Sequence, residues 1–325
     1  MAAVGAGVAL WFGARLNSLV DRIDDPFEAL PTRPSTPAPT NESGEPVEPP
    51  VNVLVLGSDS RISAGDPSQW SYGAQRTDAI MVVQVSGDRD SVAIMSIPRD
   101  SWVNVPGYGM AKINAAFSYG GPTLMIQTVE ELTGIYIDHF AVTDFESFAT
   151  VTDALGGVSM YLPNGLSGPD VSLGPGQHTL SGDEALVYVR QRYNLSGGDF
   201  SRVQRQQNWM RAIMKGVFDQ EILKDVGRLT TFSQTVLQSV AVDEGMTLPR
   251  AVTIGYSLRD IRGEDVKFMT APYSGTGWSP DGRQSIVLLD EARSQALFEA
   301  FATDTVAEFL AANPDGAVML PDAPE

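Results

Sequence analysis

The amino-acid sequence predicts an α/β fold of the mixed α-β-α kind, in which helices flank both faces of a central mixed β-sheet. A continuous apolar run at residues 51–57 is typical of a strand that is buried on both faces. Similar runs alternate along the chain with segments of helical periodicity, as they do in α/β proteins. The chain is 43% hydrophobic and 19% charged, which is ample for a core and argues against general disorder.

The first part of the globular region supplies most of the predicted strands. Apolar runs bounded by turn-forming residues predict strands at 51–57, 78–85, 91–97 and 158–163, and a strand followed by a helix over 139–157. The strands at 78–85 and 91–97 form a hairpin or lie next to each other, because a short turn-like segment joins them. Apolar residues at helical spacing predict a helix over 121–134, with Pro122 near its start and Gly134 as its stop.

Two helices are predicted in the middle of the chain. Ser181 and Glu184 form the Ser-x-x-Glu pattern of a capping box, so a short helix over 181–189 should deliver Arg190 and Arg192 at its end. A long helix opens after the flexible SGGD segment that ends at Asp199. Residues 247–325 add a helix, an apparent strand pair at 265–273 and 284–290, and helices at 290–301 and 305–312.

The chain divides into four predicted segments. Residues 1–27 hold a short or truncated transmembrane or signal-anchor segment, because 1–14 are uncharged and apolar; a signal-peptide core or an ordinary apolar helix are the alternatives. Residues 28–50 are a Pro-rich tether, since this composition cannot bury a core. We expect one domain at 51–316 and a flexible tail at 317–325. This order favours an anchored, exported protein.

Composition excludes several classes of function. The 22 Lys and Arg residues against 40 Asp and Glu residues give a net charge of −18, which disfavours a nucleic-acid partner. The chain has no cysteine, so disulfide, zinc-thiolate and cysteine-nucleophile chemistry are ruled out. Its two histidines, His139 and His178, stand in unrelated contexts and make a histidine-based triad improbable. No GxxxxGK[ST] loop for a nucleotide occurs.

Arginines gather in one short stretch of this acidic chain. Within residues 188–211, five arginines are accompanied by a single acid, Asp199; they are Arg190, Arg192, Arg202, Arg205 and Arg211. Such a density of like charge indicates either a solvated charge run or a phosphate-rich ligand, which forked guanidinium groups suit. The flexible backbone before a helix is a natural anion seat, and Gln206 would lie one turn deeper.

Two aspartates at predicted strand ends form a candidate metal site. Asp59 follows the first strand and Asp78 begins the next one, so a sheet edge should bring them together. Paired carboxylates there suit a hard cation such as Mg²⁺, and Arg61 and Arg76 accompany them. The alternative is that each aspartate caps a turn.

A second group follows the strand at 91–97. Arg99 and Asp100 come directly after Pro98 and should also lie at a sheet edge, either in the site or as an exposed ion pair. Lys112 is either part of the same site or an ordinary solvated lysine.

Four linked motifs resemble the LytR–CpsA–Psr family of cell-wall glycopolymer ligases. The resemblance covers about 51–220, in order and at the family's spacing; the motifs are NVLVLGSDSR, QRTDAIMVVQV, VAIMSIPRDSWVNVPGYGMAKINAAFSYGG and LSGDEALVYVRQRYNLSGGDFSRVQRQQNWM. It implies a single domain of the family's type, held outside the cytoplasm by a single-pass anchor in the cell membrane. This domain would transfer a phosphosugar from a polyprenyl-pyrophosphate-linked glycopolymer to peptidoglycan.

The resemblance assigns roles to individual residues. Mg²⁺ or Mn²⁺ would bind Asp59 and Asp78; the catalytic arginines would be Arg76, Arg99, Arg190, Arg192 and Arg202; and the substrate-binding residues would be Lys112, Asp199 and Gln206. Arg61 and Asp100 are further candidate substrate-binding residues from their places in the sequence and are not assigned by the resemblance. A peptidoglycan hydroxyl would attack phosphorus without ATP, and positioning and charge stabilisation would supply most of the rate. The lipid tail is expected against apolar residues of 124–155. Alternatives are a Mg²⁺-dependent pyrophosphatase acting on the same donor and a non-catalytic wall-polymer-binding protein.

Overall fold

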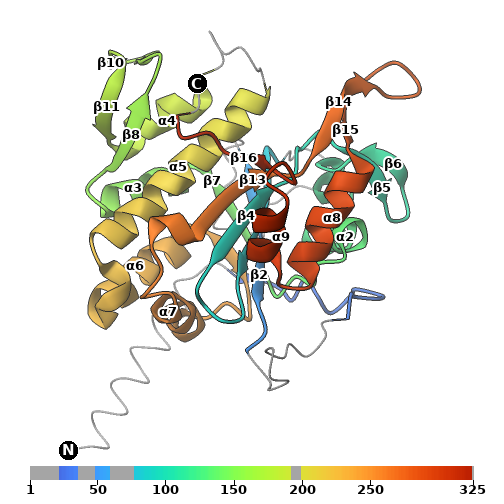
Figure 1. Cartoon of the computed structure of the whole chain (residues 1–325), viewed down its shortest axis with the longest axis horizontal. Coiled ribbons are helices and arrows are strands. Elements are labelled where there is room, and N and C mark those ends of the chain that lie inside the picture. Colours follow the sequence, from blue (N-terminus) through green and yellow to red (C-terminus); the bar gives the residue numbers. More distant parts are fainter. Residues whose placement is uncertain (1–21, 36–47, 59–76, 192–198, 324–325) are drawn as a thin grey trace, which may run out of the picture.

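The computed structural model describes residues 22–35, 48–58, 77–191 and 199–323. These residues form an eight-stranded mixed sheet with helices on both faces, as Figure 1 shows, which confirms the predicted fold class. The strand order is β1-β12-β7-β2-β3-β4-β13-β16. The strands are β1 (Arg22–Ile23), β2 (Val51–Ser58), β3 (Ala79–Val85), β4 (Val92–Ser96), β7 (His139–Asp144), β12 (Ala241–Asp243), β13 (Val266–Thr270) and β16 (Val318–Met319).

The centre of the sheet is the part that the sequence predicts best. β2 pairs antiparallel with β3 and parallel with β7, and β3 pairs antiparallel with β4, so the expected hairpin is present. β4 pairs parallel with β13. β2, β4, β7 and β13 therefore all run in one direction, and their carboxyl ends share one edge of the sheet with the amino end of β3.

Apolar side chains cover both faces of the central strands. Leu54, Leu56 and Val82 belong to one core cluster, whereas Val53 and Val55 pack into clusters on the other face, because successive strand residues point in opposite directions. The first face is covered by α2 (Ala115–Thr133), α8 (Glu291–Ala302) and α9 (Val306–Ala312). The second is covered by α5 (Asp199–Asp219), α6 (Val226–Gln238) and α7 (Leu248–Ser257).

A further layer packs on the outer side of α5. Its hydrophobic cluster includes Trp209, Ile213 and Val217 of α5 and is separate from the clusters on the sheet. The remaining elements of this layer are α3 (Phe145–Ala154), α4 (Gly182–Arg190), the hairpin β8 (Val158–Leu162) with β11 (Gly176–Leu180), and the hairpin β9 (Leu166–Gly168) with β10 (Val171–Leu173). α5 thus packs between this layer and the sheet.

Two hairpins extend from the sheet beside α2 and α8 (Figure 1). They are β5 (Trp102–Val105) with β6 (Gly109–Lys112), and β14 (Tyr273–Trp278) with β15 (Ser285–Leu289). Both are rooted at one place, because Ser101 bridges to Val287 and the Val287 amide donates to the Asp100 carbonyl at 2.9 Å.

The edge of the sheet opposite to the carboxyl ends of β2 and β4 holds buried polar groups that tie strands together. The His139 ring lies 3.2 Å from the Asp243 carboxylate, which also accepts the Phe140 amide at 3.0 Å. Gln84 donates to the Asn52 side chain at 2.9 Å. His139 therefore joins β7 to β12 and has a structural place in the fold.

Packed residues reach beyond the expected domain limits of 51–316. Ile23 is buried in the core, and Arg33 forms an ion pair with Glu130 at 2.7 Å while its guanidinium lies 3.7 Å from the Tyr136 ring centre. At the other end Leu320 is buried and β16 pairs with β13. The composition of residues 28–50 and 317–325 predicted a tether and a tail and did not indicate these contacts. One or two packed residues in a segment leave no periodic pattern in the sequence.

Two expectations about secondary structure were wrong. The apparent strand pair at 265–273 and 284–290 does not form, since β13 pairs with β4 and β16 whereas β15 pairs with β14. α2 begins at Ala115, not near Pro122, because a kink at Gly120–Gly121 joins an extra amino-terminal segment to the predicted helix. Its end is as predicted, with Gly134 in the left-handed conformation at φ 69°.

Within the described ranges, no helix combines the length and the apolar character that a membrane crossing requires. Residues 1–21, which make up most of the expected anchor, lie outside those ranges.

Candidate functional site

The candidate site lies at the sheet edge where β2, β4 and β13 end and β3 begins, here called the Asp78 edge. The backbone fixes this edge firmly: the Asp78 amide donates to the Gly57 carbonyl at 2.8 Å, and the Ile97 amide donates to the Ile80 carbonyl at 2.8 Å. Side chains that follow β4 are thereby brought beside the start of β3. This is the part of an α/β sheet at which ligands usually bind.

Asp78 and Arg99 meet at this edge, as the sequence predicts. The Asp78 side chain is only 4% exposed, and its carboxylate accepts a hydrogen bond from the guanidinium of Arg99, which is 23% exposed. A buried carboxylate without a cation would be strongly unfavourable, so the two groups hold each other in place. Asp78 therefore fixes an arginine at the boundary between the core and solvent.

Asp100 and Lys112 form a second ion pair next to the first. The Lys112 ammonium lies 3.0 Å from the Asp100 carboxylate. The Asp100 side chain is 24% exposed and the Lys112 side chain is 21% exposed. The backbone brings β6 back to this point, because the Asn114 amide donates to the Arg99 carbonyl at 3.2 Å. Lys112 is thus at the site, although it is a member of an ion pair and not a free cation.

Gln206 is the most unusual polar group of the site. It is 6% exposed, and neither its amide nitrogen nor its amide oxygen has a hydrogen-bond partner. A buried amide without partners costs about 1–3 kcal/mol, so such a group calls for a ligand or a water molecule. The sequence predicts Gln206 as a substrate-binding residue, and its unpaired amide is consistent with that role.

Neighbouring residues show where Gln206 lies. The adjacent Gln207 donates to the Ser96 hydroxyl and to the Met269 carbonyl, both at 2.8 Å, which fixes this turn of α5 at the ends of β4 and β13. Met210, one turn further along α5, packs on the sheet cluster that contains Ala79. Gln206 consequently belongs to the turn of α5 that covers the Asp78 edge.

The arginines of the cluster at 188–211 separate into different roles. Arg205 is 2% exposed; its guanidinium donates to the Tyr188 carbonyl at 2.8 Å and to the Gln191 side-chain oxygen at 3.1 Å, so it binds the end of α4. Arg211 donates to the Pro321 and Asp322 carbonyls at 3.1 and 2.7 Å and holds the C-terminal segment. Burial lowers the pKa of Arg211 from its ordinary value. These two arginines are structural.

Arg190 lies where the capping box predicts it. Ser181 and Glu184 cap α4 reciprocally, and Arg190 is the last residue of this helix. It lines a hollow of about 930 Å³ together with Gln191 and with residues of β9 and β10. This hollow also contains the carboxylates of Asp170, Asp183 and Glu184, so the surroundings of Arg190 are polar and mixed in charge.

Several predicted site residues cannot be placed from the structure. Asp59, Arg61, Arg76 and Arg192 lie outside the described residues. Asp199 and Arg202 belong to the first turn of α5, as the sequence predicts, but their side chains are outside the description as well. Of the residues predicted for the site, the structure therefore brings together Asp78, Arg99, Asp100 and Lys112, with Gln206 on the helix above them.

The described residues fit a metal ion only in part. They contain no group of three or more His, Asp or Glu side chains that would hold one. Asp78 supplies one hard oxygen donor of the kind that Mg²⁺ prefers, and an ionised carboxylate has lone pairs for both a guanidinium and a cation. Asp59, the second predicted ligand, lies outside the described residues.

An apolar pocket of about 260 Å³ lies along α5 and is continuous with the same helix face. It begins at Met210, one turn from Gln206, and its wall is formed by hydrophobic residues of α3, α5, α6 and their connections; they include Phe148, Val151, Met214, Phe218 and Phe232. Of the range 124–155, in which the sequence predicts a lipid groove, only Phe148 and Val151 take part. Buried residues of α2, such as Leu124 and Val129, pack in the core instead.

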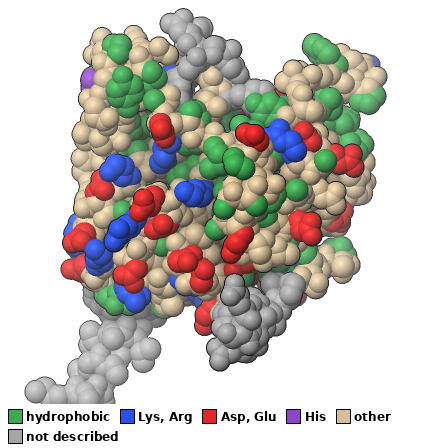
Figure 2. All heavy atoms as spheres, viewed as in Figure 1, with side chains coloured by type: hydrophobic (Ala, Val, Ile, Leu, Met, Phe, Trp, Pro, Cys, Tyr) green, Lys and Arg blue, Asp and Glu red, His purple; other side chains and the backbone are tan. Residues whose placement is uncertain are grey.

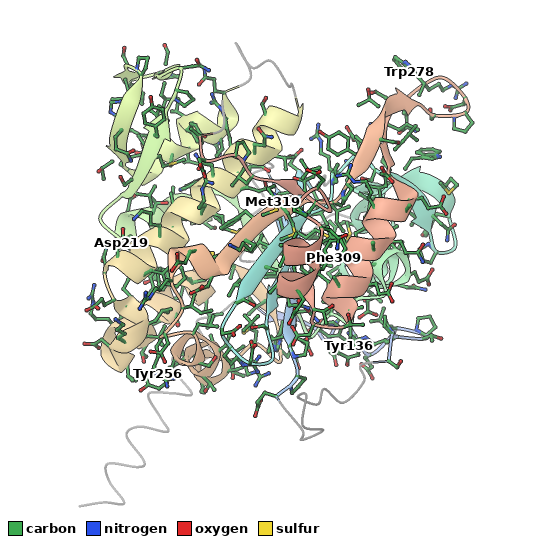
Figure 3. All side chains as sticks on the ribbon, viewed as in Figure 1. Tyr136, Asp219, Tyr256, Trp278, Phe309 and Met319 are labelled. Carbon is green, nitrogen blue, oxygen red and sulfur yellow. The ribbon has the colours of Figure 1, made fainter. Side chains whose placement is uncertain are left out.

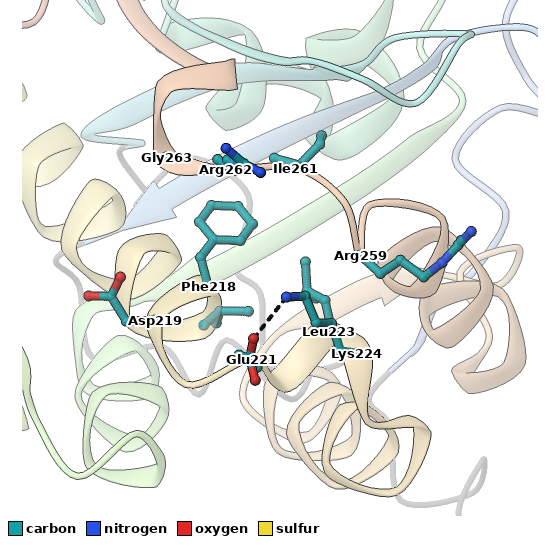
Figure 4. A pocket seen from close by; sticks show the side chains of 10 residues that line it. Phe218, Asp219, Glu221, Leu223, Lys224, Arg259, Ile261, Arg262 and Gly263 are labelled. Atoms are coloured by element: carbon teal, nitrogen blue, oxygen red, sulfur yellow. Dashed lines mark hydrogen bonds and ion pairs between the residues drawn. The ribbon is translucent and has the colours of Figure 1, made fainter.

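A smaller hollow of about 210 Å³ lies at the other end of α5 (Figure 4). Phe218 and Asp219 line it together with Arg259 and Arg262, and a contact of 2.8 Å joins Lys224 to Glu221. From Gln206 to Phe218 is twelve residues of helix, or about 18 Å at 1.5 Å per residue. This hollow is therefore separate from the Asp78 edge.

Sequence reasoning missed three polar groups at this edge. Gln207 is a structural contact, as described above, whereas the hydroxyls of Thr77 and Ser101 are buried and have no hydrogen-bond partner. Thr77 and Ser101 are adjacent to Asp78 and Asp100, so proximity to the predicted acids was the signal that could have identified them.

Comparison with known proteins gives a consistent family match. The model of the LytR_cpsA_psr family matches residues 30–300. The cell wall biosynthesis protein LcpA of Corynebacterium glutamicum is 30% identical over 301 residues, with 79% of this chain and 57% of LcpA covered. The probable cell wall biosynthesis protein LcpB of the same organism is 32% identical over 303 residues, with 90% of this chain and 66% of LcpB covered. This chain thus spans less than two thirds of either relative.

A solved structure supports the same fold. TagT bound to LI-WTA, a Bacillus subtilis protein, matches with a TM-score of 0.61 and 25% identity, covering 84% of this chain and 96% of TagT.

Proposed function

The chain belongs to the LytR–CpsA–Psr family, and from this premise we propose that it is a phosphotransferase of cell-wall assembly. It moves the phosphosugar end of a glycopolymer from a polyprenyl-pyrophosphate carrier to a hydroxyl group of peptidoglycan and releases polyprenyl phosphate. The names of LcpA and LcpB refer to cell wall biosynthesis, and TagT is bound to LI-WTA. These relatives support a wall glycopolymer as the substrate class.

The observation that carries this proposal is the arrangement along α5. Gln206 offers an unpaired buried amide at the Asp78 edge, and an apolar pocket begins one turn away at Met210. An amphiphilic donor needs both features: hydrogen-bond donors for its diphosphate and a dry cavity for its prenyl chain. A water-soluble phosphate ester has no long apolar chain to fill the apolar pocket.

In the proposed reaction the diphosphate lies against the Arg99 guanidinium. An oxygen of the acceptor hydroxyl forms a bond to the phosphorus next to the glycan, the bond from that phosphorus to the bridging oxygen breaks, and the hydroxyl proton is released. Polyprenyl phosphate takes the bridging oxygen with its electron pair. Arg99, supported by Asp78, stabilises the charge that develops on the phosphate oxygens, and Asp100 contacts the acceptor hydroxyl.

Arg76, Arg190, Arg192 and Arg202 are proposed to stabilise the remaining charge, with Arg61, Lys112, Asp199 and Gln206 binding the substrate. Mg²⁺, for which Mn²⁺ is a substitute, would be held by Asp59 and Asp78 and would neutralise diphosphate oxygens. We also propose that residues 1–27 anchor the chain in the cell membrane, with the catalytic domain facing the wall.

A transfer assay tests the proposal. The protein is incubated with a polyprenyl-pyrophosphate-linked glycan and peptidoglycan fragments, and mass spectrometry looks for the glycan–phosphodiester–peptidoglycan product. We expect this product with the unaltered chain and a loss of about 10- to 150-fold with Arg99→Ala, from the 1.5–3 kcal/mol that a charge-assisted hydrogen bond contributes.

Arg211→Ala is the matched control, because Arg211 comes from the cluster at 188–211 but binds C-terminal carbonyl groups. It should transfer like the unaltered chain. Release of lipid phosphate without the phosphodiester product would favour the pyrophosphatase instead. Polymer binding without any lipid phosphate release would favour the non-catalytic wall-polymer-binding protein.

A further inference from the structure

A second cleft opens between the two projecting hairpins, on the side of the sheet that α2 and α8 cover. Its volume is about 850 Å³, within the usual range of about 300–1,000 Å³ for small-molecule sites. The lining comes from β5 and β6, the end of α2, β15 and α8; it includes Trp102, Asn104, Met110, Leu288 and Gln295. Met110 and Leu288 are exposed by 53% and 42%, so the cleft has an apolar rim that solvent reaches.

One face of the β5–β6 hairpin leads from this cleft to the Asp78 edge. In its register Asn104 lies opposite Met110 and Trp102 lies opposite Lys112, so these four side chains point to the same face. The two pairs are two residues apart, or about 7 Å along the strand. Lys112 in turn contacts Asp100, the neighbour of Arg99. A chain molecule bound against Trp102 would therefore lie beside the cross-strand pair of Trp102 and Lys112, whose ammonium contacts Asp100 at the proposed reaction centre.

The charge of the cleft excludes the donor and suits a neutral chain. Glu131, Glu291 and Glu299 line it, and none of its described lining residues is Lys or Arg. The end of α2 at Thr133 and Gly134 adds the negative end of a helix dipole. A diphosphate or an anionic glycopolymer would be repelled here, whereas the uncharged hydroxyl and acetamido groups of a sugar find carboxylate and amide partners.

Building on the proposed function, we propose that this cleft binds the acceptor through the amino-sugar backbone of peptidoglycan, whose hydroxyl and acetamido groups are uncharged. Trp102 stacks on a sugar ring, Asn104 and the glutamates bind its polar substituents, and the chain runs along the hairpin face to Asp100. Donor and acceptor then approach the Asp78 edge from opposite faces of the sheet, since the apolar pocket lies along α5 and the cleft lies beside α2 and α8.

A binding measurement without donor tests this assignment. A short β-1,4-linked N-acetylglucosamine oligosaccharide is titrated into the full chain by isothermal calorimetry. We expect Trp102→Ala to weaken binding roughly tenfold, as expected for an aromatic contact, and Asn104→Ala, at an exposed position, to weaken it several-fold.

Trp278→Ala is the matched control. Trp278 is 69% exposed at the tip of the β14–β15 hairpin (Figure 3) and lies outside the described lining of the cleft. This variant should bind within about twofold of the unaltered chain.

The outcomes separate the inference from the proposed function. Cleft variants that bind the oligosaccharide as tightly as the unaltered chain, or a larger loss in Trp278→Ala, would overturn the assignment of the cleft. Formation of the phosphodiester product from donor and peptidoglycan fragments is measured in parallel on the unaltered chain and on Trp278→Ala, which lies outside the cleft. If oligosaccharide binding follows the cleft variants but the unaltered chain forms no phosphodiester product from donor and peptidoglycan fragments, the acceptor site stands and the transferase proposal fails.

Discussion

Replacing Gln206 by methionine should make the protein more stable and less active. Both amide atoms of Gln206 are buried without partners, so the folded protein bears an uncompensated cost of about 1–3 kcal/mol. Methionine has nearly the same length and no such cost, and we expect the free energy of unfolding to rise by about 1–2 kcal/mol. At about 2–4 °C per kcal/mol for a domain of this size, the melting temperature should rise by roughly 2–8 °C.

Activity should change in the opposite direction. If the amide donates to a diphosphate oxygen, its loss removes about 1.5–3 kcal/mol, or about 10- to 150-fold in transfer rate. Thermal unfolding and the phosphodiester assay are measured on the same preparation. Unchanged transfer in a stabilised Gln206→Met variant would remove Gln206 from the site and refute the reasoning.

The adjacent Gln207 is the matched control, because its amide nitrogen makes two hydrogen bonds, to Ser96 and Met269. Gln207→Met should lower the free energy of unfolding, since it leaves both acceptors unpaired; removal of the Gln207 side-chain oxygen, which is buried without a partner, offsets only part of this loss. The same substitution at two neighbouring positions should thus change stability in opposite directions. A fall in stability at both positions would show that Gln206 is an ordinary packing residue.

Three further outcomes are expected. Arg33→Ala should lower the free energy of unfolding by about 3 kcal/mol in urea titrations, because Glu130 is 2% exposed and loses its cation, whereas Lys215→Ala at an exposed pair should change it little. Burial, followed by the nearby Asp88 carboxylate, raises the pKa of Asp90 to about 6, so stability falls as pH rises through the interval from 3.8 to about 6. Asp90→Asn should therefore melt higher than the unaltered chain at pH 7 and equally at pH 3; a difference that persists at pH 3 would contradict this origin. Met214→Ser should weaken binding of a long-chain prenyl donor but not of a short-chain analogue in calorimetry, and equal losses for both would separate the pocket from the lipid.

Local patterns predicted local structure well. The capping box at Ser181 and Glu184 and the left-handed Gly134 depend on residues within one helical turn, and both appear as expected. Pairing between distant strands followed no such rule, because the apolar runs of β13 and β15 look alike in sequence while their partners are decided by the whole fold. The β5–β6 hairpin was missed since its four-residue strands are too short for a periodic signal.

The candidate site was predicted by residue type and corrected by burial. Arg99 and Asp78 meet because neighbouring strand ends meet, which the order of strands already indicated. Arginine identity alone could not distinguish Arg99 from Arg205, which is buried against α4, or from Arg211, which holds the C-terminal segment. Their charges are the same, so only the tertiary contacts assign the roles.

Figure 2 shows acidic and basic side chains interspersed over the face of α5 and α6, so no broad single-sign field covers that face. Selectivity then depends on groups at the site itself and should be little affected by salt, because buried and partly buried pairs such as Asp78 with Arg99 are screened far less than exposed ones.

The short strand β1 has a practical consequence for anyone who wishes to produce the domain alone. β1 is the edge strand at this end of the sheet and pairs with the outer side of β12. Starting expression at residue 51, where composition changes, would leave the backbone amide and carbonyl groups of β12 unpaired in solvent. An exposed edge strand with unpaired backbone groups can pair with strands of other molecules. A shortened protein should therefore self-associate, and a version beginning before Arg22 should stay dispersed.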